Sequence, residues 1–404
     1  MNKRSLKDRL KSVGPLVTKG QETQTTSKMP GRYIRLAEAV DGTLIEGFGG
    51  CFCRVSTVYP FGFAFGDSKL GPLDPDTPVA HSAFAADEID GTAALSDLLF
   101  FDLETTGLGG AGTVPFLVGC GSLVPGGFEV RQYLLPDYED EAGLLEHFLN
   151  EFHDRTTLVT YNGAAFDLNV WRDRMIINRV GRKLPTDSHI DLLHSARRLY
   201  RRRLESCTLV NVEREVFGFY REGDIPGYLI PSVYFDWLGS EEVGQLPTVL
   251  EHNRWDILAM YFLLLTVSEA FVTEGESLTH TDDVYSLSRV YGRRKDTKRV
   301  IDLHRRLDEE TGATLSADVL LYHSLALKRA GDWGGAVRLW QRLSGMEAAE
   351  AFDASIELAK YYEHKSEDLA AAYEHARTAE RLGARGISRS RDLQKRLSRL
   401  LSKL

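Results

Sequence analysis

Cysteine is scarce in this chain, and long apolar runs are missing from it. The 404 residues include only four cysteines, too few for a disulfide framework, and no CxxC pair or second histidine completes a zinc pattern. We expect buried thiols at Cys51, Cys53, Cys120 and Cys207, since the CFC triplet would need outside ligands to bind metal. No apolar run approaches the roughly 20 residues of a membrane span. The basic N-terminus lacks the apolar segment of a secretory signal. These absences predict a soluble, cytoplasmic protein with no membrane partner.

Excess positive charge is also missing. The net charge of −9 excludes a protein that coats nucleic acid over its whole surface. It does not exclude a nuclease, which needs only one basic strip beside an acidic centre. The length favours two or three domains.

The order of apolar patterns predicts an α/β domain over residues 98–275. LLFFDLE, TVPFLVGCGSL and FEVRQYLLP read as three antiparallel strands, with PGG as the turn between the last two. A helical segment, the strand TLVTY and a helix opening near Ala165 follow, and residues 247–271 have helical periodicity. This order is that of a ribonuclease H-like mixed sheet flanked by helices. Before it we expect a mobile basic arm over residues 1–30 and a small β-rich preface over residues 31–97.

A repeat of 36 residues marks the C-terminal part, residues 282–404. Asp296, Asp332 and Asp368 recur at this period, each followed by small or apolar residues at fixed offsets. GDWGGAVRLWQRL resembles half of a tetratricopeptide repeat. We expect an all-α, tetratricopeptide-like domain of stacked helix pairs that offers a surface to a protein partner. An unrelated helical bundle is the alternative.

Two acids at the end of the first strand begin the candidate site. Asp102 and Glu104, in FFDLETTG, lie two residues apart and therefore on one face of the strand. Two carboxylates on one face repel each other, and a divalent cation is the simplest explanation for their proximity. Alone, such a pair occurs often by chance.

Two later segments supply further candidates. In YNGAAFDLNVW, Asp167 opens a helix after a buried strand, where it could equally be a helix-capping acid. In EHNRWDILAM, His252 and Asp256 are four residues apart on one helix face, where a structural ion pair is the alternative.

The four acids Asp102, Glu104, Asp167 and Asp256 together suit two Mg²⁺ or Mn²⁺ ions, which prefer hard oxygen ligands. In a two-metal scheme one ion activates water and the other stabilises the leaving 3′ oxygen. His252 would orient or deprotonate the attacking water, because imidazole titrates near neutral pH.

DLET, NGAAFD and HNRWD resemble the three exonuclease motifs of the DEDD superfamily, which is named for four such acids. From Phe100 to about Leu265 the chain is especially similar to the bacterial YprB-like ribonuclease H-like proteins, also through HIDLLHSARRLYRR and REGDIPGYLIP. The resemblance implies a metal-dependent 3′–5′ exonuclease. One departure concerns His252: superfamily members carry either Tyr with a gap of three residues before the last acid or His with a gap of four. Here a His has the gap of three, so its role as the base is left open.

Substrate contacts have weaker support. Arginines crowd the segment after HIDLLH, and we expect Arg197, Arg198 and Arg202 to contact phosphates, although a solvated helix face is the alternative. We also assign Thr105 and Asn162 to substrate binding. The competing functions are a module that binds nucleic acid without cutting it and an adaptor that acts only through its repeats. Because all four acids are present, the sequence favours a nuclease acting on DNA or RNA.

Overall fold

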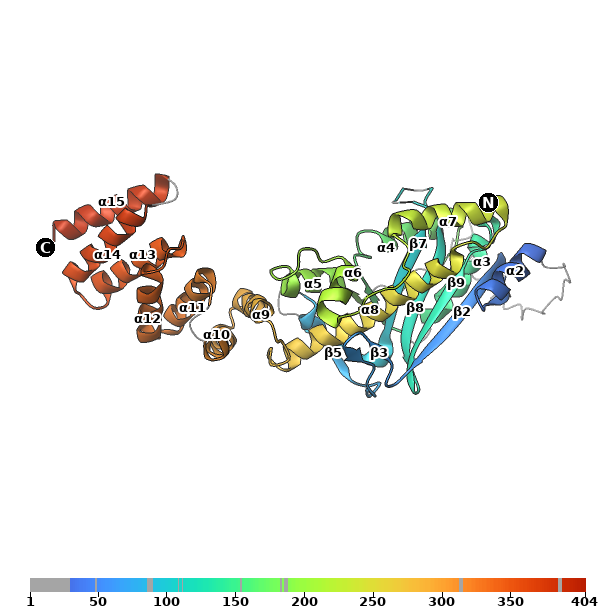
Figure 1. The fold of residues 1–404 in the computed structure, drawn as a ribbon, viewed down its shortest axis with the longest axis horizontal. Helices are drawn as coiled ribbons and strands as arrows, with labels where there is room; N and C mark the ends of the chain where they lie inside the picture. Colours follow the sequence, from blue (N-terminus) through green and yellow to red (C-terminus); the bar gives the residue numbers. More distant parts are fainter. Residues whose placement is uncertain are drawn as a thin grey trace, which may run out of the picture.

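A computed structural model describes residues 30–47, 49–85, 90–107, 109–110, 112–152, 155–181, 184, 188–311, 315–383 and 387–404. The predicted basic arm lies outside these residues except for Pro30. Figure 1 shows an α/β body from which a row of helices extends to the C-terminus.

The α/β body is built on a seven-stranded mixed sheet. The three predicted strands pair antiparallel as neighbours, whereas the two strands after them run parallel to the first. In spatial order the strands are β1 (Thr43–Gly47), β2 (Gly50–Pro60), β9 (Gly127–Leu134), β8 (Pro115–Val124), β7 (Leu98–Thr105), β10 (Thr157–Thr160) and β11 (Ser188–Asp191). The predicted ribonuclease H-like order of elements agrees with this sheet.

The segment predicted as a separate preface contributes to the same sheet. Strand β2 pairs antiparallel with β9, with Val55 opposite Gln132, and β1 pairs with β2. The added strands cover the backbone edge of β9, which would otherwise be unpaired. The rest of the segment forms helix α2 (Gly31–Ala39) and two short hairpins, β3 (Ala64–Phe65) with β4 (Ser68–Lys69) and β5 (Pro78–Ala80) with β6 (Thr92–Ala94).

Helices cover both faces of the sheet, and side chains of β7 alternate between the two cores. Phe100 belongs to the core under α8, whereas Phe101 and Leu103 belong to the core under the opposite helices. The helices are α3 (Glu141–Phe148), α4 (Asp167–Ile177), α5 (Leu192–Tyr200), α6 (Leu209–Phe217), α7 (Ile230–Ser240) and α8 (Leu246–Val272). The alternation places Asp102 and Glu104 on the α8 face.

Helix α8 is long and apolar enough to cross a membrane by length and composition alone, with a mean hydropathy of 1.6. However, 56% of that apolar window is buried inside the protein. The helix packs against β7, β8 and β9 in the centre of the α/β body. Its apolar character is therefore that of a core helix.

The C-terminal helices form successive pairs, and the 36-residue period has a structural cause. Asp332 and Asp368 cap α12 and α14 by accepting hydrogen bonds from Gly335 N and Ala371 N at 2.8 and 2.9 Å. Asp296 accepts one from Arg299 N at 3.1 Å at the start of α10. The helices are α9 (Thr281–Arg293), α10 (Thr297–Thr311), α11 (Ala317–Ala330), α12 (Trp333–Ser344), α13 (Glu350–His364), α14 (Leu369–Leu382) and α15 (Ile387–Leu401).

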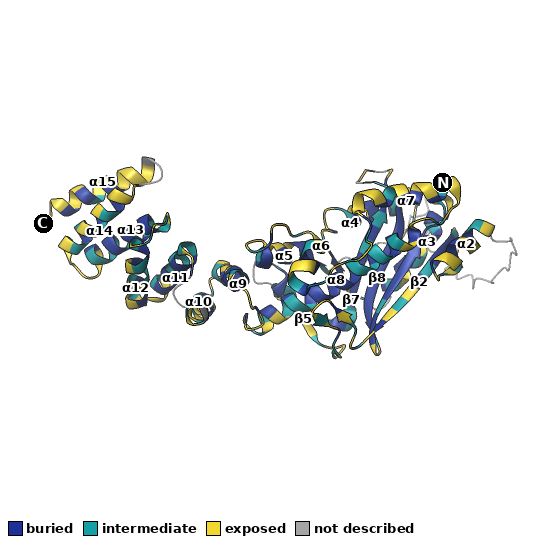
Figure 2. Ribbon diagram, in the orientation of Figure 1, coloured by how far each residue is buried: buried dark blue, intermediate teal, exposed yellow. Residues whose placement is uncertain are grey.

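The α/β body and the first helix pairs share one hydrophobic core. A single cluster of buried side chains extends from Tyr59 and Phe100 through α8 to Trp340 and Leu358, while α13 to α15 enclose a separate, smaller one. Helix α9 packs directly on α5. Figure 2 shows the buried sheet and α8 within a more exposed outer layer.

Candidate active site

Helix α8 holds the first acid of β7 in place through an amide. Asn253, fully buried, donates a hydrogen bond from Nδ2 to Asp102 Oδ2 at 2.8 Å and accepts one from Gln132 Nε2 at 2.8 Å. Gly119, opposite Asp102 on β8, makes room for this contact, because a Cβ at that position would lie 2.2 Å from Asn253 Oδ1. The orientation of Asp102 is thus fixed from two neighbouring elements.

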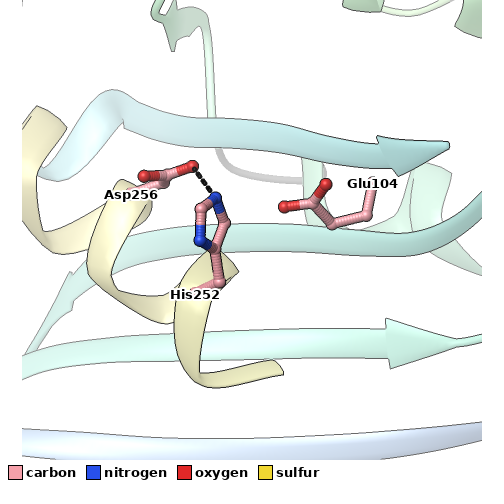
Figure 3. A group of neighbouring side chains, drawn as sticks. All are labelled: Glu104, His252 and Asp256. Carbon is pink, nitrogen blue, oxygen red and sulfur yellow. Dashed lines mark ion pairs between the residues drawn. The ribbon is translucent and has the colours of Figure 1, made fainter. Parts of the chain in front are cut away.

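Glu104, His252 and Asp256 meet between β7 and α8 (Figure 3). One ligand atom from each lies within 4.8 Å of those of the other two. His252 Nε2 is 3.6 Å from Asp256 Oδ2, one turn further along the helix. The structure therefore brings together the acid of the first predicted motif and both residues of the last.

Asp167, buried at the first turn of α4, interacts electrostatically with Asp102 and Asp256. Helix α4 follows β10, the strand next to β7. Strands β10 and β7 are parallel, so their carboxyl ends meet at one edge of the sheet. Asp191 accepts hydrogen bonds from the backbone amides of Asn162 at 2.8 Å and Ala164 at 3.2 Å. It thereby holds the loop that leads into α4.

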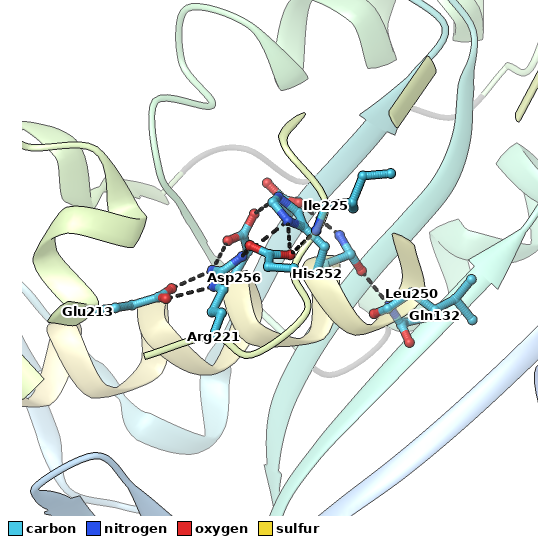
Figure 4. A network of polar contacts seen from close by, with 10 residues as sticks. Gln132, Glu213, Arg221, Ile225, Leu250, His252 and Asp256 are labelled. Carbon is cyan, nitrogen blue, oxygen red and sulfur yellow. Dashed lines mark hydrogen bonds and ion pairs between the residues drawn. The ribbon is translucent and has the colours of Figure 1, made fainter. Parts of the chain in front are cut away.

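Sequence reasoning missed a cationic partner within this site (Figure 4). Arg221, almost fully buried, forms ion pairs with Asp256 and with Glu213, the latter at 2.5 Å. Glu213, on α6, is completely buried. Arg221 lies in REGDIPGYLIP, and no local pattern in this segment indicates that its guanidinium reaches Asp256.

Asp224 from the same segment contacts His252. Its Oδ1 lies 2.7 Å from His252 Nδ1, whereas Arg221 Nη1 is 3.3 Å from that nitrogen. The shorter contact with a carboxylate places the proton on Nδ1. The Nε2 of His252 is then the basic nitrogen.

The crowded carboxylates have strongly shifted proton affinities. Burial, reinforced by Asp256 and Asp167, raises the pKa of Asp102 well above its ordinary range, and burial with Asp102 does the same for the pKa of Glu104. Burial raises the pKa of Asp167 to about 7, although backbone amides, including that of Leu103, oppose the shift. Mutual repulsion of this kind identifies a place where a cation would be favourable.

The donor set fits a hard divalent cation. Asp102, Glu104, Asp167 and Asp256 offer carboxylate oxygens, the ligands that Mg²⁺ and Mn²⁺ prefer. Burial, followed by mutual repulsion, raises the pKa values of Asp102 and Glu104. Arg221 offsets part of the negative charge through its ion pair with Asp256.

The raised pKa values predict an inverse dependence of stability on pH without metal. A carboxylic acid with a raised folded-state pKa stabilises the fold fully below its unfolded pKa and loses that contribution as pH rises through the folded value. In chelator, the thermal unfolding midpoint should fall from about pH 5 to about pH 8. Asp167→Asn should remove about 3 kcal/mol of this loss, since about two pH units of it fall within the range. Scanning calorimetry of the wild type and Asp167→Asn between these pH values would test this prediction. An equal fall of the unfolding midpoint in the two proteins would contradict it.

The two smaller residues assigned to substrate have other contacts in the structure. Thr105, buried, donates its hydroxyl to the Gly107 carbonyl at 2.6 Å. Asn162 has a left-handed backbone with φ of 66°, and its side chain is exposed. Asn162 therefore shapes the loop before α4, and the substrate roles of both residues stay predictions.

Of the three arginines predicted to contact phosphate, two have partners within the protein and one is exposed. Arg202 pairs with Asp282 at 2.5 Å and Asp318 at 2.6 Å, so its guanidinium ties α5 to the C-terminal helices and is not available to phosphate. Arg198 donates to the Phe84 carbonyl and to Ser195 Oγ. Arg197 is exposed.

The four cysteines remain free thiols. Cys51, Cys53 and Cys120 are buried, as predicted, whereas Cys207 is half-buried. Burial raises the pKa of each of the three buried thiols to about 12, which keeps them protonated and unreactive.

Comparison with known proteins gives three results. Residues 99–267 match the model of the RNase_H superfamily. The chain is 37% identical over 285 residues to the protein YprB of Bacillus subtilis (strain 168), and the alignment covers 70% of this chain and 68% of that protein. The family B DNA polymerase from the archaeon Pyrobaculum calidifontis aligns with a TM-score of 0.33 and 18% identity, over 60% of this chain and 34% of the polymerase.

Proposed function

The chain belongs to the same family as YprB of Bacillus subtilis and carries a ribonuclease H superfamily domain, and from this premise we propose that it is a divalent-metal-dependent nuclease. One observation supports the proposal: burial and mutual repulsion raise the pKa values of Asp102 and Glu104 on β7 and of Asp167 at the start of α4. Asp256 on α8 is the fourth acid, and its charge contributes to each of these three shifts. Within the class, we propose a 3′–5′ exonuclease of the DEDD type, located in the cytoplasm.

Each residue of the proposed active site has its own role in hydrolysis. When bound at the four acids, two Mg²⁺ or Mn²⁺ ions would activate water and stabilise the charge of the leaving 3′ oxygen. Asn253 fixes the carboxylate of Asp102, and Asp224 holds the tautomer of His252. His252 Nε2 then accepts the proton of the attacking water.

Arg221 gives Asp256 a counter-charge before substrate arrives. Its guanidinium is shared with Glu213, whose pKa burial raises to about 7. The contact with Arg221 holds the side chain of Asp256 in place. The C-terminal repeats, which we propose to be tetratricopeptide-like, would recruit a protein partner.

The test is hydrolysis of labelled oligonucleotides. The full chain, freed of metal with chelator, should be inactive and should regain activity with Mn²⁺ or Mg²⁺ but not with Ca²⁺, whose looser coordination does not support the required geometry. A panel of single- and double-stranded DNA and RNA, labelled at either end, identifies substrate and polarity. Retained binding with no cleavage under any metal would favour the non-cutting binding module instead.

A further inference from the structure

A basic pocket lies between the α/β body and the repeat helices. Its lining contains no acidic side chain and gathers cations from the two facing helices and the residue after α5. The cationic residues of the lining are Arg197, Arg198, Arg201, Arg289 and Arg293, and His194 lies beside them. A chain of net charge −9 thus concentrates positive charge at the junction of its two parts.

A second pocket continues this surface along the repeats. It shares Arg289 and Arg293 with the first pocket and adds Lys295 and Arg329, again without an acidic residue in its lining. We call the combined surface the basic track: Arg197, Arg198 and Arg201 at α5, Arg289 and Arg293 on α9, and Lys295 and Arg329 beyond them.

The charges of the basic track are not neutralised within the protein. In the part of the chain that the structure describes, Arg197, Arg201, Arg289 and Arg293 form no ion pair, and all four are exposed. Arg289 instead lies over the Tyr322 ring at 4.6 Å. Adjacent Arg202 and Arg203, by contrast, are paired with aspartates. Like charges gathered without counter-charge favour a bound polyanion.

The basic track begins near the carboxylates. Asp191, which holds the loop before Asp167, is also the N-cap of α5. An α-helix rises 1.5 Å per residue, so Arg197 lies roughly 9 Å and Arg201 roughly 15 Å from Asp191 along the axis of α5. From there the track leads away from the active site to α9 and α11.

We infer that the basic track binds the phosphodiester backbone of a nucleic-acid strand whose end reaches the four carboxylates. The first repeat helices are therefore part of the substrate-binding surface. Six of the seven track residues are arginines, whose planar guanidinium groups match phosphate oxygens in a bidentate way. This inference rests on the proposed nuclease function, although strand binding itself can be measured without cleavage.

The experiment compares two double charge reversals in the full chain. Arg289→Glu with Arg293→Glu alters the track, and Arg338→Glu with Arg391→Glu makes the same charge change at exposed residues of α12 and α15. Binding of a long, end-labelled single strand is measured by anisotropy in chelator over a range of salt. The track variant should bind more than tenfold more weakly, and its log–log salt slope should be smaller by roughly 1.4 for two lost phosphate contacts. The control should retain wild-type affinity and slope.

Cleavage separates this inference from the proposed function. With Mn²⁺, the track variant should hydrolyse a trinucleotide at the wild-type rate, because so short a substrate does not reach α9, while losing activity on the long strand. Two results would overturn the inference. The first is equal strand binding by the track variant and the wild type. The second is a track variant that binds the strand normally but binds poly-glutamate more weakly than the wild type does, which would identify an acidic protein as the ligand. If no protein cleaves but the track variant alone loses strand binding, the track stands and the nuclease proposal fails.

Discussion

Replacing Asp102 with alanine is expected to lower phosphodiester hydrolysis on the order of 10³-fold or more, the scale associated with losing a principal charge-stabilising group. Asp102 lies on β7 within reach of two other acids, Asp167 and Asp256, so its loss removes one of the oxygens around which a metal pair would assemble. Initial rates at saturating Mn²⁺ measure the effect.

Two further variants separate chemistry from folding. Asp102→Asn keeps an acceptor for the amide of Asn253 and removes the charge, so it should be equally inactive but melt no lower than the wild type in chelator. Asp173→Ala removes an exposed acid of α4 and should be neutral. Asp256→Ala is less informative for stability, since it leaves buried Arg221 short of a partner. Near-normal turnover by either Asp102 variant would refute the four-acid assignment.

Removal of His252 should have the second largest effect. If its Nε2 accepts the proton of the attacking water, His252→Ala loses roughly a hundredfold in turnover while metal affinity is nearly unchanged. The acidic limb of the pH–rate profile should change as well, because the neutral imidazole is the active form. Asp224→Asn should cause a smaller loss of the same kind, since it weakens the contact that fixes the Nδ1 tautomer.

A positioning role gives a different pattern. His252→Gln would then recover much of the lost turnover, and the acidic limb would persist in both variants because water at the metal still titrates. Turnover measured against pH at saturating Mn²⁺ for wild type, His252→Ala and His252→Gln distinguishes the two roles. Recovery by glutamine with an unmoved limb would end the assignment of His252 as base.

Local patterns in the sequence were sufficient for the three central antiparallel strands and for the placement of two acids on one face, but not for the addition of β1 and β2 to the same sheet. The apolar run ending at Asp102 and the turn residues PGG are short-range signals, and β7, β8 and β9 form where they predict. Alternation along β7 then fixes Asp102 and Glu104 on a common side. The family resemblance added the order of the motifs, which local reasoning alone could not connect.

Contacts between distant segments could not be predicted. The amide of Asn253 and the carboxylate of Asp102 are 151 residues apart in the chain. Arg221 lies in the loop after α6 and contacts Asp256 on α8, which is 35 residues further along the chain. The ion pairs of Arg202 could not be predicted for a similar reason: its partners Asp282 and Asp318 belong to α9 and α11, far along the chain.

The continuous core under α8 and α9 means that the repeats are not a detachable module. A fragment ending at residue 275 would leave Leu278 and Val284 behind and open to water the apolar surfaces that they cover on the α/β body. Exchange of the repeats with those of another protein would have to preserve those contacts. Exchange after His364, where α13 ends, would leave the large core intact and disturb only the separate cluster of α13 to α15. Evolutionary shuffling is therefore easier within the helical row than at the boundary suggested by the change in composition.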